Sequence, residues 1–521
     1  MTLKGLQIAV TAYDLEQSEH RGIAVYSKAL IRCLRLAGAK VWLLTEVDPT
    51  LKGRGIRRLP RQTRQMIQQA SVLNSLNLGQ KAEKLSFLER KFKLARDLRL
   101  WRQRVQKTRD LITRPKQFKA EDITRIPLDG LLDSPYPRVE RLSYLQDLEG
   151  LLCIAGIFQA TQQAAKLNRL QPVSLDLPGI DVVITTCPLN LITRTPSRVV
   201  QTVHDLIPLE YVAHNEDPLM FSHRLQACLR SKRLYVSTPT QEKYHRHIST
   251  LTGSTRGQAL PFIPEVDESV VIQPPSLRFP SWLTIDDQQV SDLRPGSYLL
   301  RQAHQAKATS NEASELDPEE AEVLKPIAKR KSELKPFRYF LFNSSVEARK
   351  NLLFLARAYA ESELSSIGIK LCVTGKLKGD DYSHAVQEIV RHEPGIILTG
   401  YVDESTKLDL YLNAMGLLSP SLVEGFGIPV LDAACLGMPA IASDCASHIE
   451  ISALHDFDQC VTTVNTLRSR DWASAMQAVA GLESERWRNA PAERRRRISR
   501  YMPLAKGFYQ QLQRDLETLL T

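Results

Sequence analysis

The sequence of 521 residues lacks any apolar run of the roughly 18 residues that a membrane-spanning helix needs. Its first apolar run, residues 6–12, is too short for the core of a signal peptide and leads into no small-residue cleavage site. With neither signal present, the sequence predicts a cytoplasmic protein that does not span a bilayer.

The sequence also lacks the spacings typical of metal and disulfide sites. Its eight cysteines form no C-x-x-C pair and stand near no group of histidines, which favours neither a zinc site nor a disulfide framework. No D-x-D string directly follows a predicted strand. We therefore expect no bound metal and no cofactor.

Positive charge is concentrated in one part of an otherwise acidic chain. The net charge is +11, but residues 52–119 hold 20 Lys and Arg against four acids, so the rest of the chain carries −5. Apolar residues recur at helical spacing within this segment, as in Leu94, Leu98 and Trp101. The pattern predicts a basic helical insertion over about residues 52–150. Residues 52–119 would either dock on an anionic membrane, or form a solvated basic helical pair that packs on the first lobe or binds a partner protein. Nucleic acid is unlikely because regularly spaced stacking aromatics are missing.

Short apolar runs alternate with helical patterns on both sides of the insertion. The predicted strands are residues 6–12, 40–45, 182–185, 199–203, 234–237, 339–343, 370–374, 396–398, 416–418 and 440–442, and the clearest predicted helices are 23–37, 350–361 and 503–520. Such alternation is typical of parallel sheets. It predicts an amino-terminal lobe over residues 1–275, a linker over 276–335, a second lobe over 336–500 and a terminal helix within 501–521.

Residues 420–439, PSLVEGFGIPVLDAACLGMP, are the most informative segment. An apolar strand there meets a glycine-containing turn that opens a helix, and in an α/β lobe such a turn lies at the ligand-binding edge of the sheet. The helix amino terminus offers free N–H groups to a phosphate. Seven residues separate Glu424 from Asp432, so their carboxylates can reach opposite ends of one extended ligand. The alternative is a plain strand-to-helix connection with solvated acids.

This segment resembles the signature of the retaining GT-B glycosyltransferases, in which two glutamates separated by seven residues flank a glycine-containing turn. The resemblance implies that Glu424 contacts hydroxyls of the donor sugar. It assigns Asp432, one methylene shorter than the family's glutamate, to the ribose. The residues of the turn that it places against the sugar and phosphates are Gly425, Phe426, Gly427 and Ile428.

Residues 347–351, EARKN, follow a predicted strand and are similar to the phosphate-binding P-R-K-N turn of the same family. Lys350 supplies a compact positive charge and Arg349 a fork of donors for the diphosphate leaving group. Many relatives carry another Arg nearer the strand, where this chain has Ser344. We therefore expect phosphate binding to depend on Lys350. A surface Arg-Lys pair at a helix start is the alternative.

Two segments of the first lobe are similar to further family motifs. Residues 22–26, GIAVY, resemble the loop beside the donor phosphates and place Gly22 there, although one glycine and an arginine of the family pattern are missing. Residues 202–211, TVHDLIPLEY, resemble a form recurrent in mannosyltransferases. That resemblance implies that His204 faces the donor sugar or the acceptor. Asp205 either orients His204 or binds the acceptor.

The resemblance as a whole implies a GT-B fold, α/β with two Rossmann-like lobes facing a cleft. It also implies a metal-independent hexosyltransferase with Glu424, Lys350 and His204 as candidate catalytic residues. The expected partners are a nucleotide-sugar donor resembling GDP-mannose and a glycan or lipid-linked acceptor, in surface polysaccharide biosynthesis in the cytoplasm or at the inner face of the membrane. Two other functions stay open: an epimerase or hydrolase acting on nucleotide sugars, and a non-catalytic sugar-nucleotide-binding protein.

Overall fold

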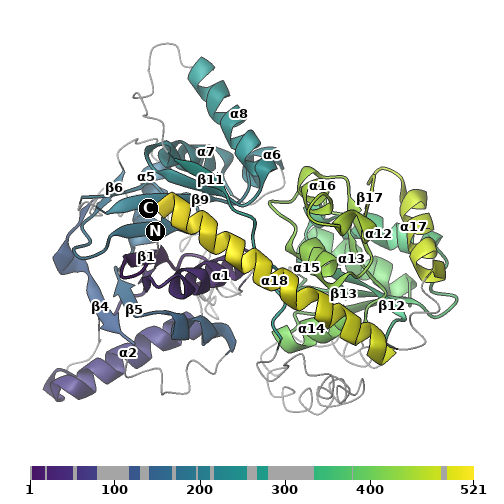
Figure 1. Ribbon diagram of the computed structural model, residues 1–521, viewed down its shortest axis with the longest axis horizontal. Coiled ribbons are helices and arrows are strands. Elements are labelled where there is room, and N and C mark those ends of the chain that lie inside the picture. The colour runs from purple at the N-terminus through teal and green to yellow at the C-terminus, as the bar shows by residue number, and fades with distance from the viewer. Residues whose placement is uncertain are drawn as a thin grey trace, which may run out of the picture. The chain divides into compact units, whose positions relative to one another are not determined.

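The computed structural model divides the chain into two compact units (Figure 1). Unit 1 comprises Met1–Pro274 together with Tyr509–Thr521, and unit 2 comprises Pro275–Phe508. The residues that the structure describes are 3–17, 20, 22–50, 56–78, 117–128, 140–166, 172–194, 197–211, 216–254, 267–279, 334–377, 379–482 and 490–520.

Unit 1 is built on an eight-stranded sheet with the order β11-β10-β9-β7-β1-β2-β5-β4 in its described part. All neighbouring strands are parallel except β4 and β5, which are antiparallel. The strands are β1 (Gln7–Thr11), β2 (Lys40–Thr45), β4 (Thr124–Pro127), β5 (Gly150–Cys153), β7 (Val182–Thr185), β9 (Arg198–Val203), β10 (Lys232–Tyr235) and β11 (Glu268–Val270). A small parallel sheet is formed by β3 (Gln117–Phe118), β6 (Val173–Leu175) and β8 (Leu191–Thr193).

The helices of unit 1 connect these strands. Helix α1 (Gly22–Leu36) buries one apolar face, which includes Tyr26 and Leu30, and its last turn carries Arg35, which suits the negative end of the helix dipole. The other described helices are α2 (Arg61–Leu78), α5 (Ile157–Lys166), α6 (Ile207–Glu210), α7 (Pro218–Ala227) and α8 (Thr238–Ser254), with short 3-10 turns η1 (Ile56–Arg58), η2 (Ala120–Asp122), η4 (Glu140–Asp147) and η5 (Cys228–Arg230).

Unit 2 contains a six-stranded, fully parallel sheet with the order β14-β13-β12-β15-β16-β17. The strands are β12 (Tyr339–Asn343), β13 (Lys370–Thr374), β14 (Ile396–Gly400), β15 (Gly416–Ser419), β16 (Ala440–Ser443) and β17 (Val461–Val464). The helices are α12 (Leu352–Glu361), α13 (Asp381–His392), α14 (Glu404–Asn413), α15 (Ile428–Leu436), α16 (Ala446–Ser452), α17 (Ser469–Leu482) and α18 (Ala490–Leu520), with 3-10 turns η9 (Ala348–Lys350) and η10 (Phe457–Gln459).

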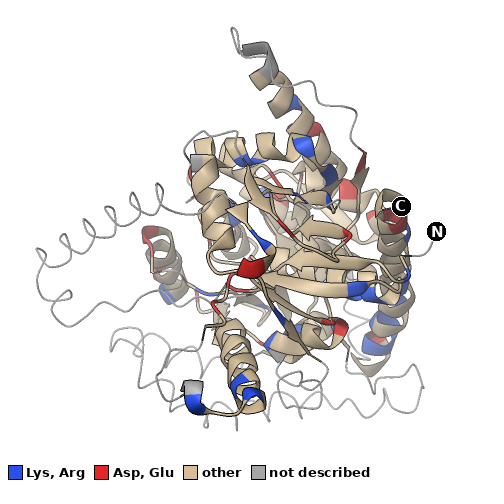
Figure 2. Cartoon of the chain, turned by 90° about the vertical axis from the view of Figure 1, so that its left-hand side faces the viewer, with Lys and Arg blue, Asp and Glu red and all other residues tan. Residues whose placement is uncertain are grey.

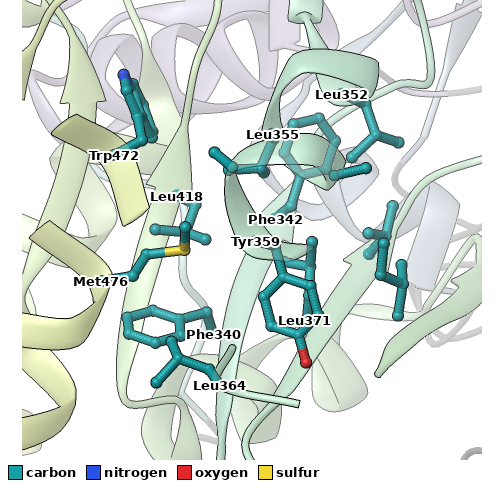
Figure 3. Packing of buried hydrophobic residues seen from close by; sticks show 14 of the residues in the cluster. Phe340, Phe342, Leu352, Leu355, Tyr359, Leu364, Leu371, Leu418, Trp472 and Met476 are labelled. Atoms are coloured by element: carbon teal, nitrogen blue, oxygen red, sulfur yellow. The ribbon is translucent and has the colours of Figure 1, made fainter. Parts of the chain in front are cut away.

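The core of unit 2 is packed between this sheet and two of its helices. Phe340 and Phe342 project from β12 toward opposite sides of Leu418, and Tyr359 of α12 and Trp472 of α17 close the cluster (Figure 3). All five side chains are almost completely buried. Burying an aromatic side chain contributes roughly 1.5–3 kcal/mol, so this core fixes β12 and β15, the two strands that carry the predicted donor motifs.

The predicted fold class is confirmed, since each unit is a parallel α/β lobe. One prediction about the insertion is wrong. Strands β4 and β5 belong to the main sheet of unit 1, so the segment up to residue 150 is not a purely helical insertion. Residues 79–116, which include most of the basic stretch, and residues 280–333 of the predicted linker lie outside the described residues.

Helix α18 begins earlier than the sequence suggests, at Ala490 instead of Pro503. Its first turns are rich in Arg, a composition that predicts a solvent-exposed segment. The Arg497 side chain is nevertheless fully buried. The Arg497 guanidinium donates to Glu493, 3.0 Å away, and to the carbonyls of Tyr411 and Ala414. These contacts fix the start of α18 in unit 2, and the chain from Tyr509 onward belongs to unit 1.

The described part of unit 1 carries charges of both signs. Basic and acidic side chains are distributed over its helices and strand ends (Figure 2). Within the basic stretch, α2 is described and buries Val72, Leu73 and Leu76. None of the described helices is long and apolar enough to cross a membrane.

Candidate functional site

Two turns meet at the carboxyl edge of the unit 2 sheet, because β12 and β15 are neighbouring parallel strands. The chain between β15 and α15 forms the first turn, and η9, between β12 and α12, forms the second. The amide of Leu422 donates to the carbonyl of Arg349 at 2.8 Å, and the Arg349 guanidinium donates to the carbonyl of Val423 at 3.4 Å. The two motifs that the sequence singled out therefore form one connected structure.

Glu424 and Lys350 form an ion pair at this junction. The Arg349 guanidinium lies 3.6 Å from the other oxygen of Glu424 and 3.1 Å from Glu347. The side chains of Lys350 and Glu424 are 9% and 10% exposed. Two cations and two carboxylates are thus held together with little solvent, at an edge of the sheet where α/β proteins bind ligands.

This environment shifts the ionisation of both partners in the pair. Burial alone would raise the pKa of the Glu424 carboxyl, but Lys350 and then Arg349 outweigh burial and hold that pKa at about 2. Burial lowers the pKa of the Lys350 ammonium, and Glu424 opposes that effect. Glu424 is therefore ionised throughout the physiological pH range. It contributes stability above the carboxyl's ordinary pKa that is lost as pH falls toward 2.

Hydrogen bonds from α16 support the turn that carries Glu424. Ser447 donates its hydroxyl to the carbonyls of Glu424 and Gly425, at 2.9 and 3.1 Å. The ring of His448 is completely buried and lies 2.9 Å from the hydroxyl of Ser443. Burial lowers the pKa of His448 to about 4, so this ring is a neutral support. Neither Ser447 nor His448 was identified as a site residue from the sequence, although both lie in α16, the helix that follows the buried strand β16.

Gly427 is the closest point between the turn and this support. Its φ of +102° lies in the region that favours glycine, and a Cβ added there would lie 2.9 Å from Cδ2 of His448. The backbone conformation and the packing therefore both require glycine.

Helix α15 starts at the next residue, Ile428, at the carboxyl edge of the sheet. Pro429 has no N–H, and the amides of Val430 and Leu431 donate to the Gly427 carbonyl. This helix start therefore offers an anion the helix dipole and the amide of Ile428. Phe426 is 5% exposed, so its ring packs in the unit and only its backbone is available to a ligand.

Ser344 lies at the end of β12, where relatives often carry an arginine. Its backbone packs against Gly375, whose φ is +134° and whose added Cβ would come within 2.1 Å of the Ser344 carbonyl oxygen. This close approach joins the loops after β12 and β13. Arg349 and Lys350 of η9 supply positive charge at the Glu424 turn.

Asp432 lies on α15 and is 1% exposed. Its two oxygens accept hydrogen bonds from the amide and hydroxyl of Ser276, at 2.6 and 2.5 Å. The ribose contact predicted for Asp432 stays a prediction, and it would require this buried arrangement to open.

His204 of unit 1 follows β9 and is 8% exposed. Its Nε2 lies 2.8 Å from the carbonyl of Thr186, and its ring meets Tyr26 edge to face with centroids 4.8 Å apart. Burial lowers the pKa of His204 to about 4. A neutral ring that donates through Nε2 keeps Nδ1 as a hydrogen-bond acceptor.

Asp205 accepts a hydrogen bond from the amide of Ile207, the first residue of α6, at 3.0 Å. The two roles predicted for Asp205, orienting His204 or binding the acceptor, stay predictions. Gly22 is exposed and opens α1.

Asp14 was not identified from the sequence. Its carboxylate accepts a hydrogen bond from the hydroxyl of Thr186 at 2.9 Å. Thr186 is also the residue whose carbonyl contacts His204. Burial raises the pKa of Asp14 to about 7. The available signal was its position three residues after β1, at the carboxyl edge of a parallel sheet.

Among the described residues, no group of three or more His, Cys, Asp or Glu side chains is arranged to hold a metal ion. The string Asp456-Phe457-Asp458 has the D-x-D form, but it lies in η10 ahead of β17. Asp456 is also paired with Arg500 at 2.9 Å. The cations that the structure pairs with Glu424 are Lys350 and Arg349.

Comparison with known proteins identifies the unit that carries this site. Residues 338–480 match the family model described as glycosyl transferases group 1. Unit 2 is a group 1 glycosyltransferase domain. The chain is also 30% identical over 115 residues to O-antigen chain mannosyltransferase B of Escherichia coli, an alignment that spans 22% of this chain and 30% of that relative. The chain therefore matches less than a third of the length of this curated relative.

Solved structures give weaker overall similarities to this chain. Sucrose-phosphate synthase from Thermosynechococcus elongatus is 13% identical with a TM-score of 0.46, covering 99% of this chain and 96% of its own. The Anabaena protein HepE, solved in complex with UDP, is 10% identical with a TM-score of 0.48, covering 99% and 100%. Similarity at this level is too low to transfer a ligand or a reaction.

Proposed function

We propose that the protein is a retaining glycosyltransferase that moves a hexose from a nucleotide-sugar donor to a glycan or lipid-linked acceptor, in surface polysaccharide biosynthesis. The observation that carries the proposal is the buried cluster of Glu424, Lys350 and Arg349 at the start of α15, inside a group 1 glycosyltransferase domain. The mannosyltransferase relative supports a hexose donor of the mannose type.

In the proposed reaction the acceptor oxygen forms a bond to the anomeric carbon while the bond from that carbon to the diphosphate breaks. The acceptor proton passes to the departing phosphate, so no protein nucleophile is needed. The leaving diphosphate gains negative charge, which Lys350, Arg349 and the dipole of α15 stabilise because they are already in place. When Lys350 pairs with the diphosphate instead of Glu424, the Glu424 carboxylate can accept hydrogen bonds from the sugar hydroxyls.

A donor panel tests the proposal. Nucleotide release and thermal shift are measured with UDP-, GDP-, ADP- and dTDP-sugars, each with and without a polyprenyl-linked glycan acceptor. We expect one nucleotide class to stabilise the protein and to be released mainly when acceptor is present. Release at an equal rate without acceptor would identify a hydrolase, and stabilisation without any release would identify a binding protein.

Transfer is expected to continue in excess EDTA, because Lys350, Arg349 and the dipole of α15 take the place of a divalent cation. The rate with EDTA should equal the rate with added Mg²⁺ or Mn²⁺ within a factor of about two. An absolute requirement for either ion would refute metal independence.

His204 is expected to act in its neutral form, because burial lowers its pKa to about 4. Changing His204 to Asn removes one hydrogen-bonding nitrogen and should lower kcat about 10-fold, the scale of one hydrogen bond. The shape of the pH profile between pH 5.5 and 8 should not change. A contrary result would be a wild-type rate that changes with pH in that range while the variant's rate does not. That result would show that His204 titrates during the reaction.

Peripheral membrane contact is proposed for residues 52–119, on the basis of their segment charge of +16. Anionic vesicles should sediment the protein and neutral vesicles should not, since clustered bases each contribute about 1 kcal/mol near an anionic surface. Binding should fall when at least four basic residues become Gln, chosen from Arg90, Lys91, Lys93, Arg96, Arg99 and Arg102. Equal binding to both vesicle types would instead favour a partner-protein surface.

A further inference from the structure

The carboxylate of Asp432 is occupied by the protein's own backbone. Residues 275–279 are the first of unit 2, and Ser276 in this segment gives Asp432 both its amide, at 2.6 Å, and its hydroxyl, at 2.5 Å. The two donors reach different oxygens of one carboxylate. This two-point contact joins positions 156 residues apart in the sequence.

Tyr501 of α18 fixes the same segment from a second side. Its hydroxyl accepts a hydrogen bond from the amide of Leu277 at 2.8 Å and lies 3.4 Å from an oxygen of Asp432. Its ring packs against Phe279 with centroids 5.2 Å apart. Tyr501 is 2% exposed. Three parts of unit 2, namely α15, α18 and residues 275–279, are therefore joined around one buried carboxylate.

Burial, more than the number of hydrogen bonds, separates Asp432 from a ligand. A carboxylate has about four lone-pair positions, so each oxygen could accept one more donor if a donor could reach it. Asp432 is 1% exposed, which leaves no access for a pair of ribose hydroxyls. Lys407 acts on the Asp432 charge without forming an ion pair with it. Lys407 and the two donors of Ser276 together oppose the cost of burying this carboxylate.

We propose that Asp432 is a positioning residue that fastens residues 275–279 and α18 to the helix carrying the donor turn, and that Asp432 does not contact the ribose of the bound nucleotide. The second half of this inference rests on the proposed function. It predicts that nucleotide affinity depends on the diphosphate and the base, and that removal of the ribose hydroxyls has little effect.

Nucleotide binding to the wild-type protein tests the ribose half. UDP and GDP are each compared with their 2′,3′-dideoxy forms by calorimetry. We expect affinities within about twofold for each pair. A preference for the ribonucleotide of about 10-fold or more, the scale of lost hydrogen bonds to a charged group, that disappears in Asp432→Asn would overturn the inference. If that preference persists in Asp432→Asn, another residue contacts the ribose and the role of Asp432 stands.

The variant Asp432→Glu separates the two roles, because each role predicts a different change in nucleotide affinity. If Asp432 contacts ribose, the longer glutamate restores the family's residue and affinity for UDP or GDP is equal or higher. If Asp432 fastens the segment, the extra methylene does not fit a fully buried position. We then expect loosening of residues 275–279 and lower affinity for ribo- and dideoxynucleotides alike.

Hydrogen exchange tests the fastening half without any nucleotide. The amides of Ser276 and Leu277 should be protected in the wild type, and Asp432→Ala should raise exchange in the peptide covering residues 271–279. Asp432→Asn, which keeps one acceptor oxygen, should give an intermediate value and serves if the alanine variant fails to fold. The matched control is Asp380→Ala, which removes a carboxylate that accepts the amide of Ser383 at 2.8 Å and should leave this peptide unchanged.

The outcomes of the two experiments are distinguishable. Unchanged exchange in residues 271–279 of Asp432→Ala and Asp432→Asn would overturn the fastening role. If neither UDP nor GDP binds the wild type and the donor panel is also negative, the proposed function fails, while the exchange result still decides what Asp432 does.

Discussion

Replacing Lys350 by Met is expected to lower turnover by about 100-fold or more, the scale for losing one preorganised group that stabilises charge in the transition state. Lys350 is the cation in direct contact with Glu424, and it is almost completely buried. Methionine has a similar length but carries no charge. Steady-state kinetics with the donor found in the panel, combined with thermal unfolding, measures the effect separately from any loss of folded protein.

Glu424→Gln should cause a loss of similar size, and the double variant should lose less than the product of the two single losses. Residues in direct contact are rarely additive, because each single change leaves the partner buried without its counter-charge. A matched control is Arg391→Met, which removes an exposed ion pair with Glu388, 2.8 Å long and also in unit 2. Exposed pairs contribute little, so this control should keep full activity. Wild-type turnover in a well-folded Lys350→Met protein would refute the site.

The second large effect is expected for Gly427→Ala. An alanine there must adopt a φ of +102°, and its Cβ would lie 2.9 Å from the His448 ring. Holding a non-glycine residue in this conformation costs about 1–3 kcal/mol, and the buried ring must also move. The turn that holds Glu424 should therefore shift, and nucleotide affinity should fall by about 10–100-fold, measured by calorimetry.

The variant Gly427→Ala/His448→Ala separates the two causes. It removes the clash but keeps the backbone strain, so we expect only partial recovery. The control is Gly481→Ala in α17, where an added Cβ meets nothing within 4 Å. Replacing this helical glycine should stabilise the protein by about 0.5–1 kcal/mol and leave nucleotide affinity unchanged. Unchanged affinity in Gly427→Ala would show that the turn tolerates a side chain and would remove it from the site.

The buried parallel strands could be predicted from the sequence because their residues are apolar throughout. Strands β2, β7, β12 and β13 have the predicted bounds. The strands that were missed are short or partly exposed. Strand β17, VTTV, has two exposed residues in the middle, and its pattern does not stand out from a loop. Such strands are recognised only once a neighbouring strand is in place.

The candidate site was predicted in part for a similar reason. Glu424 and Lys350 belong to local motifs, each of which follows a predicted strand, so their position at one sheet edge could be expected. Their ion pair with each other could not, since side-chain contacts between residues 74 apart depend on the packed structure. The same holds for Asp432 with Ser276, and for Asp14 with Thr186, 172 residues away.

The path of α18 has a consequence for the order in which the protein can fold. The helix of 31 residues is about 47 Å long, and its last part completes unit 1 through the Lys232 ammonium, which donates to the Leu519 carbonyl at 2.8 Å. Unit 1 therefore consists of two stretches of chain, and the second stretch leaves the ribosome only after all of unit 2. Although its first stretch is synthesised first, unit 1 cannot complete its fold until Tyr509–Thr521 have followed unit 2.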